Sequence, residues 1–219
     1  MSKYIKPTPL ASPEPGGVAV GSLPQAKRHK RKFDAVITIE EPGARPNLRL
    51  RFAPDPGRAH LVLQFEDVDT DSLGIRVATL EDVERAIIFA RSWADRSMLV
   101  HCFHGVGRSA GIALAVLADR LGPGNEAQAL DRLLAVRPEV TPNLVVVALA
   151  DRLLERSGRL CEAVAAWEAS APGLAEARAA RLHFARTRPE LYAARDSHVG
   201  NGGNPPLPRN RETQAWCHA

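Results

Sequence analysis

One stretch near the middle of the chain reads as a buried strand, a tight loop and a buried helix. The apolar residues of the strand lead to His101, and Cys102 follows at the start of a loop that contains two glycines. Arg108 ends this loop, and the apolar run over residues 112–118 reads as a buried helix. A loop that opens a helix presents unpaired backbone N–H groups and the positive end of the helix dipole. The stretch therefore predicts an anion-binding site that contains a thiol.

The residues from 101 to 109 read H-C-F-H-G-V-G-R-S. This segment resembles the H-C-x-x-G-x-x-R-S signature of the protein tyrosine and dual-specificity phosphatases, and it matches every fixed position. The resemblance extends more loosely over about Val18 to Trp167. It implies the fold of this superfamily, an α/β domain with a central, mostly parallel sheet flanked by helices. The site is expected at the carboxyl end of the strand over Met98–His101.

The hydrophobic pattern predicts the other elements of such a domain. Further strands are expected over residues 18–20, 33–39 and 60–65, and residues 47–52 are expected to form another strand or an extended loop. One helix is expected to begin at Leu80 behind a capping box of Thr79 and Asp82. Other helices are expected over residues 125–136, 144–154 and 160–167. The segment R-P-E-V-T-P-N over residues 137–143 resembles a phosphatase turn whose last two residues open a helix behind the phosphate loop.

The composition divides the chain into three parts. Residues 1–17 are rich in Pro, Ser and Gly and are expected to form a flexible N-terminal lead-in. The phosphatase-like domain is expected over residues 18–170. Residues 171–219 are expected to form a C-terminal extension, with an Ala- and Arg-rich helix of low stability over about 173–186 and a disordered tail around 200–208.

Cysteine usage and charge set the expected surroundings of the protein. The cysteines, at positions 102, 161 and 217, suggest no disulfide framework and lack metal-ligand spacing, so no metal or other cofactor is expected. No apolar run has the length of a signal peptide or a membrane span, which predicts a cytoplasmic protein without a membrane partner.

The formal net charge of +4 suits an anionic substrate but is too small to favour nucleic acid. The basic run Lys27–Lys32 is expected to be a solvated turn, with a patch for an acidic partner as the alternative.

Cleavage of a phosphate monoester needs a nucleophile, a group that stabilises the transferred charge and a proton donor. Cys102 is the candidate nucleophile in its thiolate form, which the helix start and Arg108 favour. The guanidinium of Arg108 can hold two phosphoryl oxygens, and the two loop glycines let the backbone turn its N–H groups inward. The resemblance implies that Ser109 hydrogen-bonds the sulfur and that His101 fixes the loop. The predicted phosphate-binding residues are Phe103, His104, Gly105, Val106, Gly107 and Arg108.

The proton donor is expected on a different loop. In the dual-specificity phosphatases that this chain resembles, an aspartate after the preceding core strand protonates the leaving group and later activates water. The strand over residues 61–65 is followed by Glu66, Asp67, Asp69 and Asp71. Asp67 is the predicted general acid, with Asp69 as the alternative because strand ends are placed only to within a few residues. The surplus acids are expected to be solvated.

Together these residues predict a phosphatase that acts on phosphate monoesters through a phospho-cysteine intermediate. The predicted substrate is a protein carrying phosphotyrosine, or phosphotyrosine mixed with phosphoserine and phosphothreonine. Phosphoinositide-directed relatives often carry lysines in the loop, whereas this chain has Phe103, His104 and Val106. The enzymatic alternative is an inositol-phosphate, phosphoinositide or RNA 5′-phosphatase with the same chemistry. The non-enzymatic alternative is a phosphate-binding scaffold, a class that usually lacks the Cys, the Arg or the acid.

Overall fold

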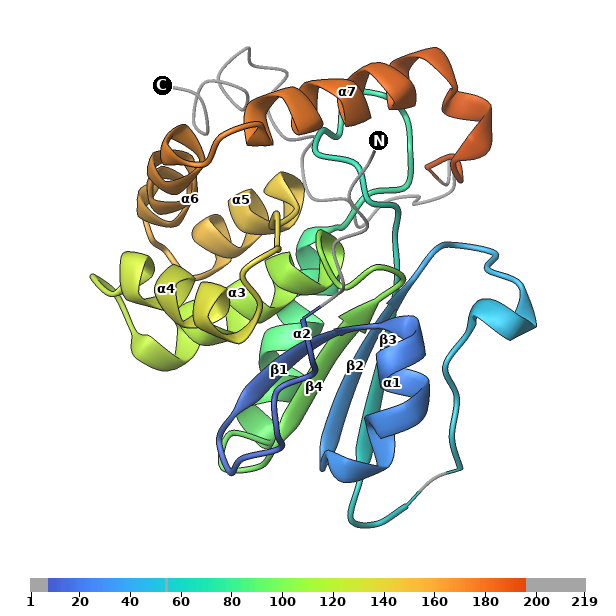
Figure 1. Ribbon diagram of the computed structural model, residues 1–219, viewed down its shortest axis with the longest axis vertical. Coiled ribbons are helices and arrows are strands. Elements are labelled where there is room, and N and C mark those ends of the chain that lie inside the picture. Colours follow the sequence, from blue (N-terminus) through green and yellow to red (C-terminus); the bar gives the residue numbers. More distant parts are fainter. Residues whose placement is uncertain (1–7, 54, 196–219) are drawn as a thin grey trace.

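The computed structural model describes residues 8–53 and 55–195 of the 219-residue chain. Four parallel strands form the central sheet in the order β1-β4-β2-β3 (Figure 1). Their bounds are β1 Val18–Ser22, β2 Ala35–Glu40, β3 Ala59–Gln64 and β4 Met98–Cys102. All four strands point their carboxyl ends to the same edge of the sheet, and β4, which carries the Cys102 segment, lies between two neighbours. The predicted α/β class with a parallel sheet is confirmed.

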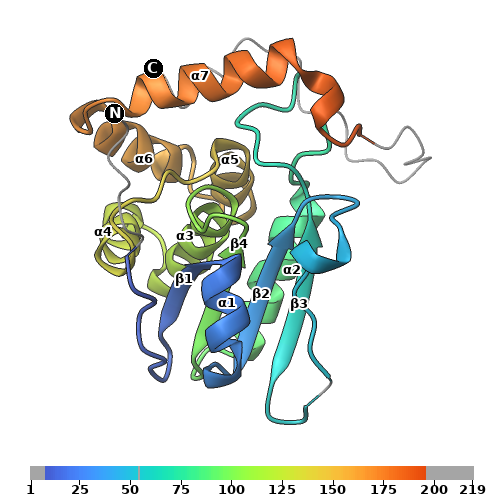
Figure 2. The ribbon, with the colours of Figure 1, turned by 45° about the vertical axis from the view of Figure 1, so that its right-hand side comes forward.

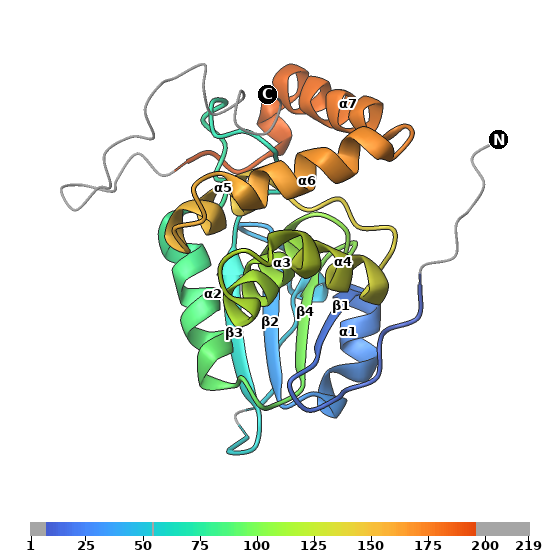
Figure 3. The same ribbon diagram turned by 90° about the vertical axis from the view of Figure 1, so that its left-hand side faces the viewer.

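Helices cover the two faces of the sheet unequally. On one face lie α2 (Leu80–Ser92), α3 (Arg108–Leu121), α4 (Glu126–Val136) and α5 (Leu144–Leu153), while α1 (Leu23–His29) lies on the other (Figure 3). Because side chains alternate along a strand, Ile37 and Ile39 of β2 join the larger core and Val36 joins a smaller cluster with α1. The smaller face is completed by residues of the loop after β2, including Leu50. The parallel strands are therefore buried on both sides, as their nearly continuous apolar sequences require.

The α3 helix is the central helix of the larger layer. Every residue from Arg108 to Ala118 is buried, which is consistent with the unbroken apolar run in the sequence. Gly122, with φ +78°, follows the helix and ends it. The start of α3 is therefore held rigidly at the carboxyl edge of the sheet, beside the end of β4.

Two more helices follow the sheet domain. They are α6 (Arg159–Ser170) and α7 (Leu174–Thr187), and a short 3-10 turn, η3 (Pro189–Leu191), comes after them. Figure 2 shows α7 running across the end of the molecule toward which the strands point. The helix expected at residues 173–186 is thus present, and it lies over the loops at the carboxyl edge of the sheet.

Several local predictions have clear outcomes. Thr79 accepts a hydrogen bond from the backbone of Asp82 and caps α2, so the capping box is confirmed. Residues 47–52 form no strand; they contain the end of η2 (Pro46–Leu48) and an extended loop. The basic run Lys27–Lys32 is helical rather than a simple turn, since it forms the end of α1 and the 3-10 helix η1 (Lys30–Lys32). The predicted tail at 200–208 and Cys217 lie outside the described residues.

No helix in the described part of the chain is long and apolar enough to cross a membrane.

Candidate active site

The sulfur of Cys102 lies inside the loop that joins β4 to α3. The residue is 1% exposed. The backbone N–H of Gly105 donates to Sγ at 3.2 Å, and the Ser109 hydroxyl oxygen lies 3.3 Å from the same sulfur. Donors that point at a sulfur atom stabilise negative charge on it. The structure therefore brings Cys102 and Ser109 into the contact that the resemblance implied.

Gly105 allows this loop to close. Its φ of +75° is in the left-handed region, and a Cβ atom there would lie 2.5 Å from the carbonyl carbon and oxygen of Gly21. The backbone of β1 therefore leaves no room for a side chain. The same two segments also meet at a second contact, where the backbone N–H of Leu23 donates a hydrogen bond to the carbonyl oxygen of Phe103 at 3.1 Å. The junction between β1 and α1 thus shapes one side of the loop.

Arg108 is a buried cation at the other end of the loop, with 3% of its surface exposed. It donates one hydrogen bond to the Phe65 carbonyl and one to Glu41, each at 3.0 Å. Its Nε has no hydrogen-bond partner among the described residues. Burial alone would lower the pKa of Arg108, but the charges of Cys102, Asp67 and Glu41 outweigh that effect and raise it. Arg108 therefore stays charged and keeps its Nε–H unpaired.

His101 lies behind the loop and contacts its backbone. One ring nitrogen, Nδ1, lies 3.4 Å from the Cys102 carbonyl oxygen, and the other, Nε2, lies 2.8 Å from the Thr38 hydroxyl. The same hydroxyl lies 2.8 Å from Nε2 of His60. Burial is the main cause that lowers the pKa of both histidines to about 4, so both rings are neutral at neutral pH. The Thr38 hydroxyl therefore joins two neutral imidazoles to the backbone of Cys102.

Buried His101 is expected to make the folded protein less stable in acid. Because its pKa is about 4 when folded and 6.5 when unfolded, the unfolded chain binds an extra proton as the pH falls. The free energy of unfolding should therefore decrease from about pH 6.5 down to about pH 4, by on the order of 3 kcal/mol for this residue. Urea unfolding across this range should show a weaker pH dependence in a His101→Gln variant. His183→Gln changes an exposed histidine and serves as the control. Equal pH dependence in the His101→Gln variant and the unchanged chain would contradict a neutral buried ring.

The acid loop, residues 65–71 after β3, brings Asp67 to the Cys102 loop. A side chain at Gly107 would overlap the Asp67 carboxylate, so the two loops touch at this point. Oδ1 of Asp67 accepts a hydrogen bond from the Asn143 amide at 3.0 Å. The Asp67 carboxylate is thus held against the Cys102 loop at Gly107.

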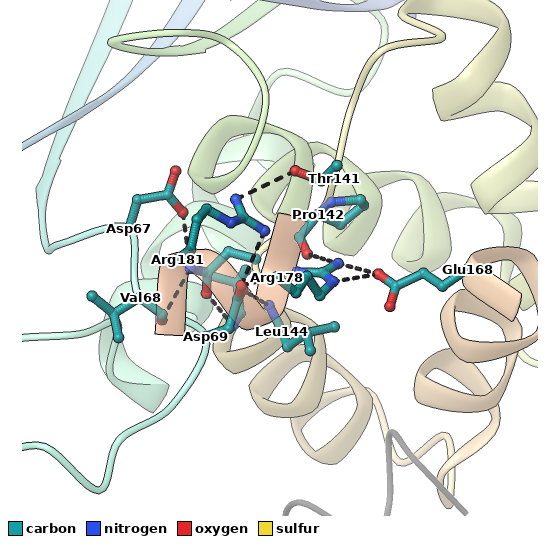
Figure 4. A network of polar contacts seen from close by, with 11 residues as sticks. Asp67, Val68, Asp69, Thr141, Pro142, Leu144, Glu168, Arg178 and Arg181 are labelled. Carbon is teal, nitrogen blue, oxygen red and sulfur yellow. Dashed lines mark hydrogen bonds and ion pairs between the residues drawn. The ribbon is translucent and has the colours of Figure 1, made fainter. Parts of the chain in front are cut away.

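Asp69 faces another part of the molecule, although only one residue separates it from Asp67. Its Oδ1 accepts the backbone N–H of Leu144 at 3.0 Å (Figure 4). Its Oδ2 makes ion pairs with Arg178 at 3.0 Å and with Arg181 at 3.1 Å. Both oxygens are therefore engaged in contacts away from the Cys102 loop.

The expectation that the surplus acids are solvated is wrong for two of them. Asp69 is bound by the two arginines, and Glu66 is buried and accepts the backbone N–H of Ala193 at 3.0 Å. Burial raises the pKa of Glu66. The physical reason is that a segment far along the chain covers the acid loop.

The turn before α5 supports both loops, and sequence reasoning found only part of its role. Asn143 caps α5 through Val146, as the resemblance implied, and its backbone N–H donates to the Gly107 carbonyl at 3.2 Å. Its contact with Asp67 was not predicted. Nor was the role of Arg137, which is fully buried and donates to the carbonyls of Val20 and His104. Arg137 is a charged residue in a predicted turn, and nothing in the local sequence indicates that such a residue is buried.

The remaining predicted loop residues form the rim of the site. Phe103 and His104 are exposed and their rings contact edge to face, 4.7 Å apart, while Val106 is half-buried. Beside the rim, the loop after β2 and the end of the C-terminal segment border a groove of about 510 Å³. The groove is lined by Glu41, Pro42, Gly43, Ala44, Arg45, Leu48, Glu66, Phe184, Leu191, Tyr192 and Ala193. It reaches the site at Glu41, the partner of Arg108. Within the described residues, no three or more His, Cys, Asp or Glu side chains are grouped to hold a metal ion.

The fold and site together define an α/β domain with a thiol at the end of a parallel strand and a buried arginine at the start of the next helix. No family model and no curated protein sequence matches the chain. Its structure is similar to solved structures of dual-specificity and tyrosine phosphatases.

The sequence identity, TM-score and coverage of three of these solved structures show how far the similarity extends. Human DUSP28 is 19% identical with a TM-score of 0.49, and the match covers 69% of this chain and 97% of that one. A mouse putative dual specificity phosphatase complexed with zinc tungstate is 20% identical with a TM-score of 0.47, covering 75% and 96%. PTPMT1 in complex with PI(5)P is 19% identical with a TM-score of 0.46, covering 65% and 95%.

Proposed function

We propose that the protein is a phosphatase that hydrolyses phosphate monoesters through a phospho-cysteine intermediate. The observation that carries this proposal is the convergence of three groups on one loop. The Cys102 sulfur accepts the Gly105 N–H and contacts the Ser109 hydroxyl, buried Arg108 keeps an N–H unpaired, and the Asp67 carboxylate lies against Gly107. These are the nucleophile, the charge stabiliser and the proton donor that the reaction needs.

In the first step, the Cys102 thiolate attacks the phosphorus atom. The S–P bond forms while the P–O bond to the leaving group breaks, and protonated Asp67 gives its proton to the departing oxygen. Arg108 and backbone N–H groups of the loop stabilise the negative charge on the transferred phosphoryl oxygens. The products of this step are the alcohol or phenol and the phospho-cysteine.

In the second step, water replaces the sulfur. The Asp67 carboxylate, now ionised, takes a proton from water as the oxygen attacks phosphorus, and the S–P bond breaks. The Ser109 hydroxyl, 3.3 Å from Sγ, stabilises the thiolate that leaves. Inorganic phosphate departs, and both Cys102 and Asp67 return to their starting states.

The proposed substrate is a phosphorylated protein, with phosphotyrosine as the preferred residue. The groove beside the site offers apolar side chains at Leu48, Phe184 and Leu191, which suit the side chains that flank a phosphorylated residue. The Cys102 loop has no lysine, and Phe103 at the rim is 38% exposed and available to an aromatic ring. Both features favour a peptide over a highly charged inositol phosphate.

A substrate panel tests this function. Phosphate release should be measured with a phosphotyrosine peptide, a phosphoserine peptide, PI(5)P in vesicles and an RNA 5′-triphosphate. We expect kcat/KM on the phosphotyrosine peptide to exceed the others by roughly tenfold or more, a difference of about 1.4 kcal/mol in transition-state binding. A higher value on PI(5)P or RNA would overturn the substrate class. No release from any of them would overturn the enzymatic proposal and favour the scaffold.

A further inference from the structure

The C-terminal clamp, residues 174–195, holds the acid loop from the outside. Its helix α7 lies over the loops at the carboxyl edge of the sheet (Figures 1 and 2). Arg178 on α7 is 6% exposed, and it makes an ion pair with Asp69 and donates to Glu168 of α6. Arg181, one turn later on the same helix face, also makes an ion pair with Asp69. Two cations therefore converge on a single carboxylate of the acid loop.

The same arginines contact the turn that supports Asp67. Arg178 donates to the carbonyl of Pro142 at 3.0 Å, and Arg181 lies 3.4 Å from the Thr141 hydroxyl (Figure 4). The next residue, Asn143, donates to the Asp67 carboxylate. The clamp is thus connected to Asp67 along two routes, through Asp69 on the acid loop and through the turn before α5.

The end of the clamp provides a second attachment to the acid loop. Ala193 donates its N–H to Glu66 at 3.0 Å, and its carbonyl accepts the N–H of Arg76 at 2.8 Å. Ala194 forms an antiparallel bridge with Ile75. Glu66 directly precedes Asp67, so the clamp fixes the residues on both sides of the candidate acid.

The buried charges make this arrangement rigid. Burial alone would lower the pKa of Arg178, but Asp69 and Glu168 outweigh that effect and raise it. Removing one partner from a buried ion pair leaves an uncompensated charge, which costs far more than breaking an exposed pair. The acid loop therefore has one strongly preferred position while the clamp is in place.

We propose that Arg178 and Arg181 are positioning residues for the phosphatase reaction. Through Asp69 and the turn before α5, they hold Asp67 at the distance from the Cys102 loop at which it can protonate the leaving oxygen. The C-terminal clamp is then part of the catalytic unit, beyond the boundary that the sequence suggested near residue 170. This inference rests on the proposed function, because it assigns a support to the general acid of that reaction.

The test compares two aryl phosphates in an Arg178→Gln variant. Phenyl phosphate has a basic leaving group that needs the proton, whereas p-nitrophenyl phosphate has an acidic one that needs it much less. We expect kcat/KM on phenyl phosphate, which reports the leaving-group step and not the later attack of water, to fall by roughly tenfold to a hundredfold, because small misplacements of a catalytic group have effects of this size. The fall on p-nitrophenyl phosphate should be several times smaller. A purely structural role would lower both rates equally.

Matched variants complete this test. Arg186→Gln makes the same change on the exposed face of α7 and should leave both rates unchanged. If Arg178→Gln fails to fold, Arg181→Gln carries the test, because the Arg181 side chain is 36% exposed and its loss disturbs the core less. In an Asp67→Asn background, adding Arg178→Gln should have almost no further effect, since both changes act through the same group.

The outcomes separate the inference from the function on which it rests. Equal losses on both substrates, or fully additive effects with Asp67→Asn, would overturn the positioning role while Cys102-dependent turnover remains. Turnover by the unchanged chain that does not depend on Cys102 would overturn the proposed function itself.

Discussion

Replacing Cys102 by serine is expected to lower phosphate release by roughly 10⁴-fold or more, the scale seen when an enzyme loses its nucleophile. A serine hydroxyl is a far weaker nucleophile than a thiolate unless a neighbouring base activates it. Within residues 8–53 and 55–195, the polar groups that contact Sγ are the Gly105 N–H and the Ser109 hydroxyl, and neither is such a base. Steady-state release from a phosphotyrosine peptide measures the loss. Rapid acid quenching and mass spectrometry should find the phospho-enzyme on residue 102 in the unchanged chain alone.

Two comparisons make the Cys102→Ser result specific. Cys161→Ser makes the same substitution at a buried cysteine of α6 and should retain most of the activity. The Cys102→Ser variant should still gain thermal stability from inorganic phosphate, because Arg108 and the loop N–H groups remain. Turnover that survives in Cys102→Ser would exclude the phospho-cysteine route. Phosphate binding without any turnover in the unchanged chain would favour the scaffold.

The sequence predicted the parts of this protein that local patterns determine. The strands β2, β3 and β4 are short apolar runs ended by polar or turn residues, and a run of this kind is recognisable without its neighbours. The Cys102 loop was predicted for the same reason, since its residues are consecutive. The basic run Lys27–Lys32 shows the limit of such local prediction. A run of basic residues is compatible with a helix end and with a solvated turn, so the sequence did not reveal the helices α1 and η1 there.

Contacts between distant segments were beyond the reach of these patterns. The Ala- and Arg-rich sequence around α7 predicts a helix of low stability. Its buried Arg178 is held by ion pairs with Asp69 and Glu168, and no hydrophobic period reveals them. Arg137 is a similar case. It can be buried because the backbone carbonyls of Val20 and His104, which are distant in the sequence, accept hydrogen bonds from its guanidinium.

The choice between Asp67 and Asp69 shows how the same limit affects the site. The two residues lie two positions apart, and the sequence left both open with a preference for Asp67. What distinguishes them in space is that Arg178 and Arg181, more than a hundred residues later in the chain, engage Asp69. Asp67 meets Gly107 and Asn143 instead. A distant helix therefore engages one of two similar acids, and the other lies against the Cys102 loop at Gly107.

Replacing Asp67 by asparagine is accordingly expected to lower kcat/KM on phenyl phosphate, which reports the leaving-group step and not the later attack of water, by roughly 10²- to 10⁴-fold, the usual contribution of a general acid. Asparagine has the same shape and can still accept the Asn143 hydrogen bond through its side-chain oxygen, but it has no proton to give. The loss on p-nitrophenyl phosphate should be much smaller, because that leaving group departs without protonation. Rates on a series of aryl phosphates should therefore depend more steeply on leaving-group basicity in the variant.

Asp69→Asn is the matched comparison, the same change two residues away. It keeps an acceptor for the Leu144 N–H but weakens the ion pairs with Arg178 and Arg181. We expect a loss of about tenfold on phenyl phosphate, at the lower end of the range expected for Arg178→Gln, because the asparagine oxygen can still accept hydrogen bonds from the two arginines. If Asp69→Asn instead produced the larger loss and the steeper dependence on the leaving group, Asp69 would be the acid. The ion pairs on α7 would then have to open in each catalytic cycle, because a carboxylate held by two arginines cannot reach the Cys102 loop.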